Sequence, residues 1–313
     1  AFQRGRVALV FATLFAAPLR VRMYGEESHY YASDDQAYTL YRRQADMYLR
    51  LFEQHPDKFQ PVASRFQLAK LLARWQNPEE SQPPTGMLIL MEGAEAVRQP
   101  RELEEWWELG VRVIGPAWIG NRFCGGTSEP GPLTPEGLRL LEAMAELGFT
   151  LDLSHMDSHA ALQALDRYEG SVIASHANAL ALLKGETNNR HLTDEVIRGL
   201  IARGGVIGVV PANPFLVHGW KRDQPRELVS LQHVAAQVDY ICQLAGSAQH
   251  AGLGTDFDGG FGVQDAPHEI DTIADLHRLA PMLAQKGYTE NEIDQIFGGN
   301  WLALLERTLP ETI

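Results

Sequence analysis

Cysteine is scarce in this chain, which has only Cys124 and Cys242 among its 313 residues. Two cysteines far apart in sequence are too few for the disulfide framework that stabilises small secreted domains. We therefore expect both to be free thiols in a reducing compartment, and we predict a cytoplasmic location.

Long apolar runs and basic clusters are missing as well. No apolar run approaches the roughly 20 residues that a membrane-spanning helix requires. Lys and Arg together number 27 against 40 for Asp and Glu, which gives a net charge of −13. Such a chain has no electrostatic footprint for nucleic-acid phosphates or anionic lipid. We therefore expect neither nucleic acid nor a membrane among its partners.

The N-terminal residues 1–18, AFQRGRVALVFATLFAAP, imitate a secretory signal through two arginines, an apolar run and small residues. The alternative is a buried strand. VALVFATLF is rich in β-branched and aromatic residues and Pro18 follows it closely, which favours the strand. We interpret this stretch as the first strand of the chain.

Short apolar runs typical of strands alternate along the chain with patterns typical of amphipathic helices. This alternation predicts an α/β fold in which helices cover a parallel sheet. At this length a (β/α)8 barrel of TIM type is favoured, with a doubly wound sheet as the alternative. The strand-like runs are residues 7–15, 87–91, 111–114, 149–153, 171–174, 206–210 and 251–255. The helical patterns cover residues 34–54, 135–147, 158–170, 193–204 and 228–246.

The predicted strands fall one short of the eight that close a barrel of this type. The sequence also begins almost directly in a strand, so we expect the first barrel strand to be absent from it. We predict one barrel domain over residues 1–313, with an extended insertion at about 18–86. The insertion contains His29, which we interpret as a solvated loop residue.

Polar residues follow four of the predicted strands at the point where each strand ends. They are Glu92, His155, His176 and Asp256. Barrel enzymes collect their chemistry at the C-terminal ends of the strands. A single histidine there is often a core residue, but four such residues in register predict a shared site.

Two imidazoles and a carboxylate on separate strands are suitable ligands for Zn²⁺. Metal sites of this kind support hydrolysis of amide-like bonds. A further carboxylate, here Asp256, is a candidate for carrying a proton from water to the leaving amine. The residues therefore predict a metal-dependent hydrolase.

An ordered set of motifs runs along the chain: MEGAEAV (91–97), LDLSHMD (151–157), ASHANA (174–179), NNRHLTDEVIR (188–198), GLGTDFDGG (252–260) and FGGNWLALL (297–305). This set resembles the membrane (renal) dipeptidase family of the amidohydrolase superfamily. The resemblance runs from near residue 7 to the C-terminus. It implies a (β/α)8 barrel with two zinc ions that hydrolyses dipeptides with relaxed side-chain preference. Members often form dimers, so we expect a homodimer here.

The resemblance assigns roles to individual residues. Glu92 would bridge both metals, and His155 and His176 would hold the second. Asp256 resembles the acid/base carboxylate of the family. Arg190 resembles the arginine that grips the free carboxylate of a dipeptide, a task suited to a planar fork of donors.

Neighbouring residues have plainer interpretations. His159 lies a turn into the following helix and matches nothing in the family pattern, so we interpret it as a helix-surface residue. Asp157 is a candidate N-cap. Arg190 itself has an alternative role as an ordinary loop cation before a helix capped by Thr193.

Two departures from the family pattern affect the prediction. The first strand of the family ends in a His-x-Asp pair that completes the first metal site, and nothing before residue 7 supplies it. We expect that pair in residues missing from this sequence; the alternative is a protein that lacks one metal. The other departure is Trp118, which aligns with a family histidine that stabilises the tetrahedral intermediate. Trp offers one indole N–H and a large apolar face, so we treat Trp118 as a substrate-binding residue.

We therefore predict a zinc-dependent hydrolase that cleaves dipeptides or similar small carboxylate-bearing amides. One alternative is an amidohydrolase acting on N-acyl amino acids, lactams, lactones or esters. Another is a metal-binding barrel without turnover. His218 and Trp220, in the long loop 211–227, are further candidates for contact with substrate.

Overall fold

The structure is a computed structural model that describes residues 1–21 and 30–312, so His29 lies outside the described residues. The strands are β1 (Leu9–Leu14), β2 (Ala17–Pro18), β3 (Tyr30–Tyr31), β4 (Phe59–Pro61), β5 (Thr85–Glu92), β6 (Val111–Gly115), β7 (Cys124–Gly126), β8 (Glu129–Leu133), β9 (Thr150–Asp152), β10 (Val172–Ile173), β11 (Ile207–Val209) and β12 (Ala251–Leu253). The α-helices are α1 (Asp34–Gln54), α2 (Arg65–Gln76), α3 (Leu103–Glu108), α4 (Pro135–Leu147), α5 (Ser158–Arg167), α6 (Asp194–Ala202), α7 (Asn213–Leu216), α8 (Leu231–Ala245), α9 (Leu279–Gln285), α10 (Glu290–Asp294) and α11 (Asn300–Thr308).

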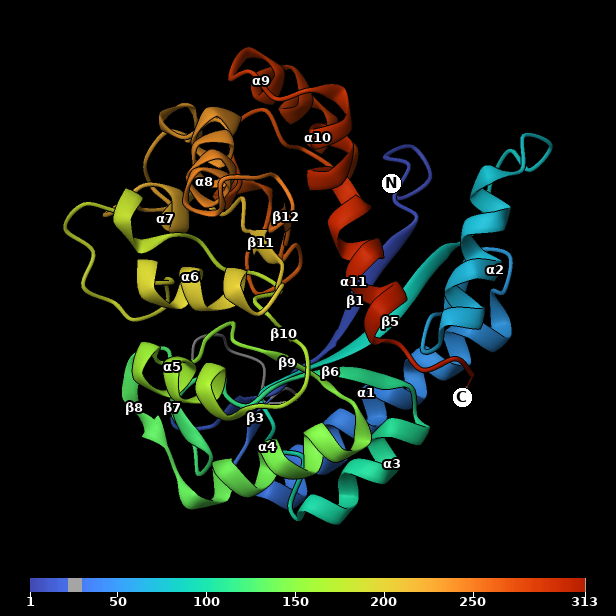
Figure 1. Cartoon of the computed structure of the whole chain (residues 1–313), viewed down its shortest axis with the longest axis vertical. Coiled ribbons are helices and arrows are strands. Elements are labelled where there is room, and N and C mark those ends of the chain that lie inside the picture. Colours follow the sequence, from blue (N-terminus) through green and yellow to red (C-terminus); the bar gives the residue numbers. More distant parts are fainter. Residues whose placement is uncertain (22–29, 313) are drawn as a thin grey trace.

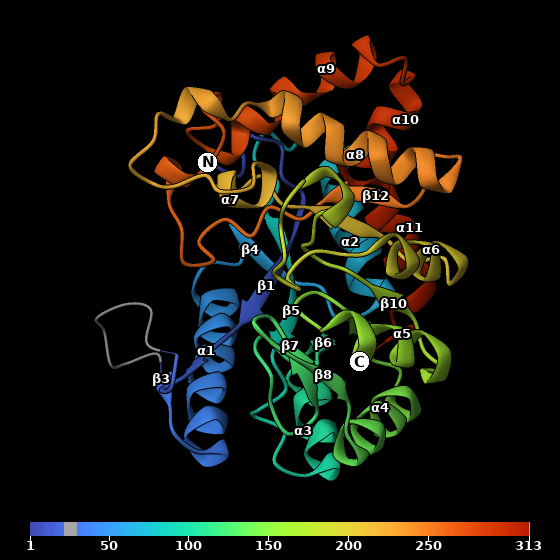
Figure 2. The same ribbon diagram turned by 90° about the vertical axis from the view of Figure 1, so that its left-hand side faces the viewer.

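The seven predicted strands form one parallel series. Strands β1, β5, β6, β9 and β10 pair in that order, a bridge from Ala174 to Ile207 continues the series to β11, and β11 pairs with β12. Figures 1 and 2 place α1, α3 and α4 on one side of these strands and α6 and α8 on another. Among the described residues no backbone ladder joins β12 to β1.

The core follows from the two-residue period of the strands, which sends alternate side chains to opposite faces. Ile89 and Met91 pack in the cluster that includes Tyr41 of α1 and Trp106 of α3. Leu88 and Leu90 lie in a second cluster. It also contains Val113, Ile173 and Trp301. The continuously apolar run in β5 is thus buried on both faces, as a covered parallel strand requires.

Capping residues set the helix boundaries that the sequence predicts. Helix α1 begins after Ser33, whose side chain accepts a hydrogen bond from the backbone N–H of Gln36. Helix α4 has Thr134 as N-cap and ends at Gly148, which has φ 87°. An N-cap oxygen satisfies an otherwise unpaired N–H, and glycine adopts the left-handed conformation without a Cβ clash. The predicted bounds 34–54 and 135–147 are therefore confirmed.

Side chains pair with backbone groups on the outer edges of β12 and β1. The N–H of Ile207 donates a hydrogen bond to the carbonyl of His250. Because carbonyls alternate in direction along a strand, those of Ala251 and Leu253 in β12 point away from β11. The Asn300 side-chain amide donates to Ala248 and Ala251, and the Trp301 indole donates to Leu253. At β1, the Tyr48 hydroxyl donates to Thr13 and the Gln44 side chain pairs with the N–H and carbonyl of Phe15.

None of the helices in the described ranges is long and apolar enough to cross a membrane.

Candidate functional site

The three predicted metal ligands meet at the C-terminal ends of three strands of one sheet. Glu92 ends β5, while His155 and His176 follow β9 and β10. The Oε1 atom of Glu92 lies 3.1 Å from His155 Nε2 and 3.4 Å from His176 Nε2. The two Nε2 atoms are 3.0 Å apart. The order of the strands thus brings three residues that are far apart in sequence into one compact cluster.

Hydroxyl groups hold the other nitrogen of each imidazole. His155 Nδ1 lies 2.9 Å from Thr127 Oγ1, and His176 Nδ1 lies 2.7 Å from Ser175 Oγ. The Ser175 hydroxyl donates its hydrogen to Asp152, so Ser175 accepts the Nδ1–H of His176. This arrangement leaves the Nε2 lone pair of His176 directed toward Glu92, as a metal ligand requires.

Asp152 organises the backbone beneath the cluster. Its Oδ1 atom accepts from the N–H groups of Ser154 and Ser175, at 3.0 and 2.8 Å. The hydroxyl of Ser154 in turn accepts from the N–H of His176 at 3.0 Å. One buried carboxylate therefore ties together the two segments that carry His155 and His176.

Two of the site residues have unusual backbone conformations. His155 has φ 67° and Asp256 has φ 51°, in the left-handed region that non-glycine residues seldom adopt. Such conformations persist where the surrounding structure imposes them, and they cluster at functional sites. His155 lies three residues after the end of β9, and Asp256 lies three residues after the end of β12.

Burial and charge shift the pKa values of the site residues. Burial, with the Arg190 cation adding to it, lowers the pKa of His155 to about 3 and keeps its imidazole neutral. Burial raises the pKa of Asp256 to about 6, although the charges of His176 and Arg190 oppose this. A carboxyl that titrates near neutrality suits proton transfer.

Glu92, His155 and His176 fit a metal ion. Each offers a ligand atom, and these atoms all lie within 4.8 Å of one another. A carboxylate oxygen and two imidazole nitrogens form a donor set that Zn²⁺ accepts. Their assignment as ligands remains a prediction.

Arg190 is buried next to this cluster with part of its hydrogen-bonding capacity unused. It is 4% exposed, and its Nη2 donates to the carbonyl of His176 at 2.8 Å. Its Nε and Nη1 have no partner among the described residues, and the guanidinium lies 5.1 Å from the ring of Phe215. Because unpaired buried donors are costly, these two nitrogen atoms indicate a site for an anionic ligand group.

A set of amide hydrogen bonds holds the loop that carries Arg190. Asn189 donates to Asp157 Oδ2 at 2.8 Å and to the carbonyl of Gly126, and it accepts from the N–H of Ser128. Asn188 accepts from the N–H of Arg190 at 2.8 Å. The β7–β8 hairpin, the start of α5 and the Arg190 loop are therefore joined at one point.

Trp118 lies on the other side of the cluster. Its ring centroid is 6.1 Å from that of His155 and 5.1 Å from that of Phe15. Asp256, beyond β12, is close enough for the charges of Glu92, His176 and Arg190 to act on its pKa. The structure thus brings all six predicted site residues to one end of the strand series.

Other predicted residues lie apart from the cluster. His159 is exposed on α5, and Asp157 caps that helix by accepting from its backbone N–H at 3.0 Å. Thr193 caps α6 as predicted. His218 pairs with Glu186 at 3.0 Å, and Trp220 is buried.

Sequence reasoning missed Thr127, Asp152, Ser175 and Asn189. Ser175 directly precedes His176 and Asn189 directly precedes Arg190, so adjacency to a predicted residue was the signal available for these two. Thr127 lies in a hairpin 28 residues before His155, and only the fold brings them together.

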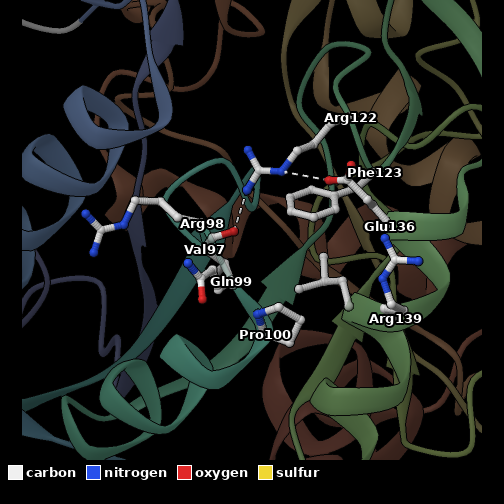
Figure 3. A pocket seen from close by; sticks show the side chains of 9 residues that line it. Val97, Arg98, Gln99, Pro100, Arg122, Phe123, Glu136 and Arg139 are labelled. Atoms are coloured by element: carbon white, nitrogen blue, oxygen red, sulfur yellow. Dashed lines mark hydrogen bonds and ion pairs between the residues drawn. The ribbon is translucent and has the colours of Figure 1, made fainter.

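A separate surface pocket of about 170 Å³ lies beside the start of α4 (Figure 3). Arg122 reaches across it to the carbonyl of Val97 and to Glu136, and it also pairs with Asp34. Because these partners already satisfy its charged donors, the pocket is a weaker candidate site than the metal cluster.

Known proteins share this sequence pattern and fold. The family model described as membrane dipeptidase, peptidase family M19, matches residues 2–310. An uncharacterized protein in the pqqA 5′ region of Klebsiella pneumoniae is 34% identical over 215 residues, which cover 66% of this chain and 75% of that protein. Dipeptidase verJ of Clonostachys rogersoniana is 25% identical over 71% of this chain. That match spans 56% of the verJ protein.

A solved structure supports the fold. The crystal structure of a metallo peptidase from Rhodobacter sphaeroides, liganded with a phosphinate mimic of the dipeptide L-Ala-D-Ala, has a TM-score of 0.80 and 22% identity. The alignment covers 98% of this chain and 88% of that one. The parallel strand series is thus that of a TIM-type barrel. The chain belongs to the membrane dipeptidase family, peptidase family M19, of metallo-dipeptidase hydrolases.

Proposed function

We propose that the protein is a zinc-dependent hydrolase that cleaves the peptide bond of dipeptides or similar small amides with a free carboxylate. The observation that carries this proposal is Arg190, which is buried beside the candidate metal ligands and has two nitrogen donors without a partner among the described residues. The names of two similar proteins support it, because one is a dipeptidase and the other binds a dipeptide mimic.

In this proposal each residue has a distinct task. Glu92, His155 and His176 would hold the metal, which would polarise the scissile carbonyl and activate water. Arg190 binds the substrate carboxylate through Nε and Nη1 and so fixes the position of the amide. Asp256 accepts a proton from water and returns it to the leaving amine.

A second zinc ion and a homodimer are also part of the proposal. The cluster described above supplies three ligands. A second metal would require ligands beyond these three. Light scattering tests the dimer, and metal analysis tests the zinc count.

Dipeptide hydrolysis tests the function most simply. We expect the zinc-loaded protein to release amino acids from dipeptides. Arg190→Ala should lower kcat/KM by about a hundredfold, mainly through KM, because a buried charge-assisted contact is lost. The control is Arg198→Ala on the surface of α6, which should leave the kinetics unchanged. Activity confined to substrates without a free α-carboxylate would contradict the role of Arg190.

A second candidate function is hydrolysis of N-acyl amino acids. It is favoured by Trp118, whose apolar ring lies beside His155, where a substrate would place the group opposite its carboxylate. Parallel assays with lactams, lactones and esters cover the remaining alternatives. Bound metal without turnover on any of them would instead favour a non-catalytic barrel.

A further inference from the structure

Phe15 and Trp118 form an aromatic wall at one side of the candidate metal cluster. The two rings meet edge to face, with centroids 5.1 Å apart and an interplanar angle of 70°. Trp118 also lies 6.1 Å from the ring of His155. Both side chains are half-buried, so part of each ring remains accessible. Edge-to-face pairing fixes the rings relative to each other.

The backbone beneath the aromatic wall is held on both sides. The side-chain amide of Gln44 pairs with the N–H and the carbonyl of Phe15, at 2.8 and 2.6 Å. The carbonyl of Trp118 accepts from the N–H of Thr127 at 3.1 Å. Thr127 is also the partner of His155 Nδ1. The wall is therefore positioned by the same hairpin that orients a candidate ligand, which makes it a preformed surface.

Strand order places the aromatic wall and Arg190 on opposite sides of the cluster. Phe15 follows β1 and Trp118 follows β6, whereas Arg190 follows β10 and packs on Phe215 beyond β11. His155 and His176 lie between these two groups. A substrate with its carboxylate on Arg190 and its amide at the cluster must therefore direct its other end toward the wall.

From this geometry we propose that the aromatic wall selects substrates with a large apolar group on the side of the scissile bond opposite the carboxylate. The inference rests on the proposed function and narrows its substrate class. Neither ring carries a charge, and the indole N–H is the one polar group they offer. Burial of a leucine or phenylalanine side chain against them favours binding, whereas a charged group would lose hydration without gaining a partner.

A matched substrate series tests this inference. The substrates are dipeptides with alanine at the carboxylate end and Gly, Ala, Leu, Phe or Glu at the other. We expect kcat/KM to rise at least tenfold from Gly to Leu and Phe and to be lowest for Glu. In Trp118→Ala, kcat/KM for the Phe substrate should exceed that for the Gly substrate by no more than about threefold. Trp118→Phe should retain part of the wild-type preference. The control is Trp75→Ala at the end of α2, which should leave the ratio intact.

Isothermal titration calorimetry with non-hydrolysable phosphinate analogues of the same series measures dissociation constants independently of turnover. We expect the dissociation constants to follow the same order and to lose it in Trp118→Ala. Two results would overturn this inference and leave the proposed function standing. One is hydrolysis of the whole series with equal kcat/KM. The other is an unchanged preference for Phe over Gly in Trp118→Ala and Phe15→Ala proteins that have normal melting temperatures. No hydrolysis but ordered, Trp118-dependent binding would support the wall and overturn the proposed function. The absence of both would overturn both.

Discussion

At the scale of single residues, the orientation of the candidate ligands depends on hydroxyl groups that are not ligands themselves. Ser175 donates to Asp152 and can therefore only accept from His176 Nδ1. This fixes the tautomer in which Nε2 is free of hydrogen. Thr127 plays the corresponding part for His155. Such outer partners commonly affect metal affinity by ten- to a hundredfold.

We expect Ser175→Ala to weaken zinc binding by roughly tenfold or more, because His176 loses the acceptor that holds its tautomer. Competition with a chromogenic chelator measures the affinity, independently of turnover. Ser230→Ala is the control, since Ser230 caps α8 far along the chain from the site. Equal zinc affinity in the wild-type and Ser175→Ala proteins would contradict this role.

The sequence predicts the candidate ligands better than the residues that support them. Glu92, His155 and His176 follow apolar runs, and parallel strands bring such positions together whatever their separation in sequence. The partner of His155 lies in the β7–β8 hairpin, and no periodic pattern predicts that hairpin or its contact. The role of Ser175 depends on a side-chain rotamer, which sequence does not specify.

At the scale of elements, side chains of α11 and α1 satisfy strand edges. Asn300 is 7% exposed, and its amide donates to the carbonyls of Ala248 and Ala251 at 2.6 and 2.7 Å. Gln44 makes a comparable pair of bonds to Phe15. Strand edges carry unpaired backbone groups that are costly when buried, so these contacts stabilise β12 and β1.

Replacing Asn300 with alanine should destabilise the fold by about 1–3 kcal/mol, because two buried carbonyls lose their donor. Urea unfolding followed by circular dichroism measures the change. The exposed Asn291 of α10 provides the matched control, and its alanine variant should be within about 0.5 kcal/mol of wild type. A similarly small change in Asn300→Ala would show that these bonds do not stabilise the edge.

The side chain of Asn189 holds the loop that carries Arg190. Its side chain joins the Arg190 loop to the β7–β8 hairpin and to Asp157. We expect Asn189→Ala to raise KM for dipeptides about tenfold with a smaller change in kcat, since Arg190 loses its fixed position. Asn77→Ala, in the turn after α2, is the control. An effect on kcat alone, or on melting temperature alone, would assign Asn189 a different role.

At the scale of the whole molecule, the buried residue His191 affects stability at low pH. Burial, with a smaller contribution from the Arg190 cation, lowers the pKa of His191 from 6.5 to about 3. The unfolded chain therefore binds a proton below about pH 6.5 that the folded chain does not. Stability is full above that pH and falls as the pH drops toward 3.

The contribution of His191 to the pH dependence of the free energy of unfolding is large enough to measure. His191 alone should cost up to about 1.4 kcal/mol of unfolding free energy per pH unit within that window. We expect the loss of stability between pH 7 and pH 5 to be smaller in His191→Gln than in wild type. His159→Gln, at an exposed position on α5, should lose as much as wild type. Parallel losses in all three proteins would show that His191 does not contribute.

The most direct test of the central claim is the metal content of the purified protein, measured by elemental analysis beside the variant Glu92→Gln, His155→Ala, His176→Ala. The account predicts at least one zinc ion per wild-type chain and almost none in the triple variant. Equal metal content in the two proteins, or none in either after growth with zinc, would contradict it.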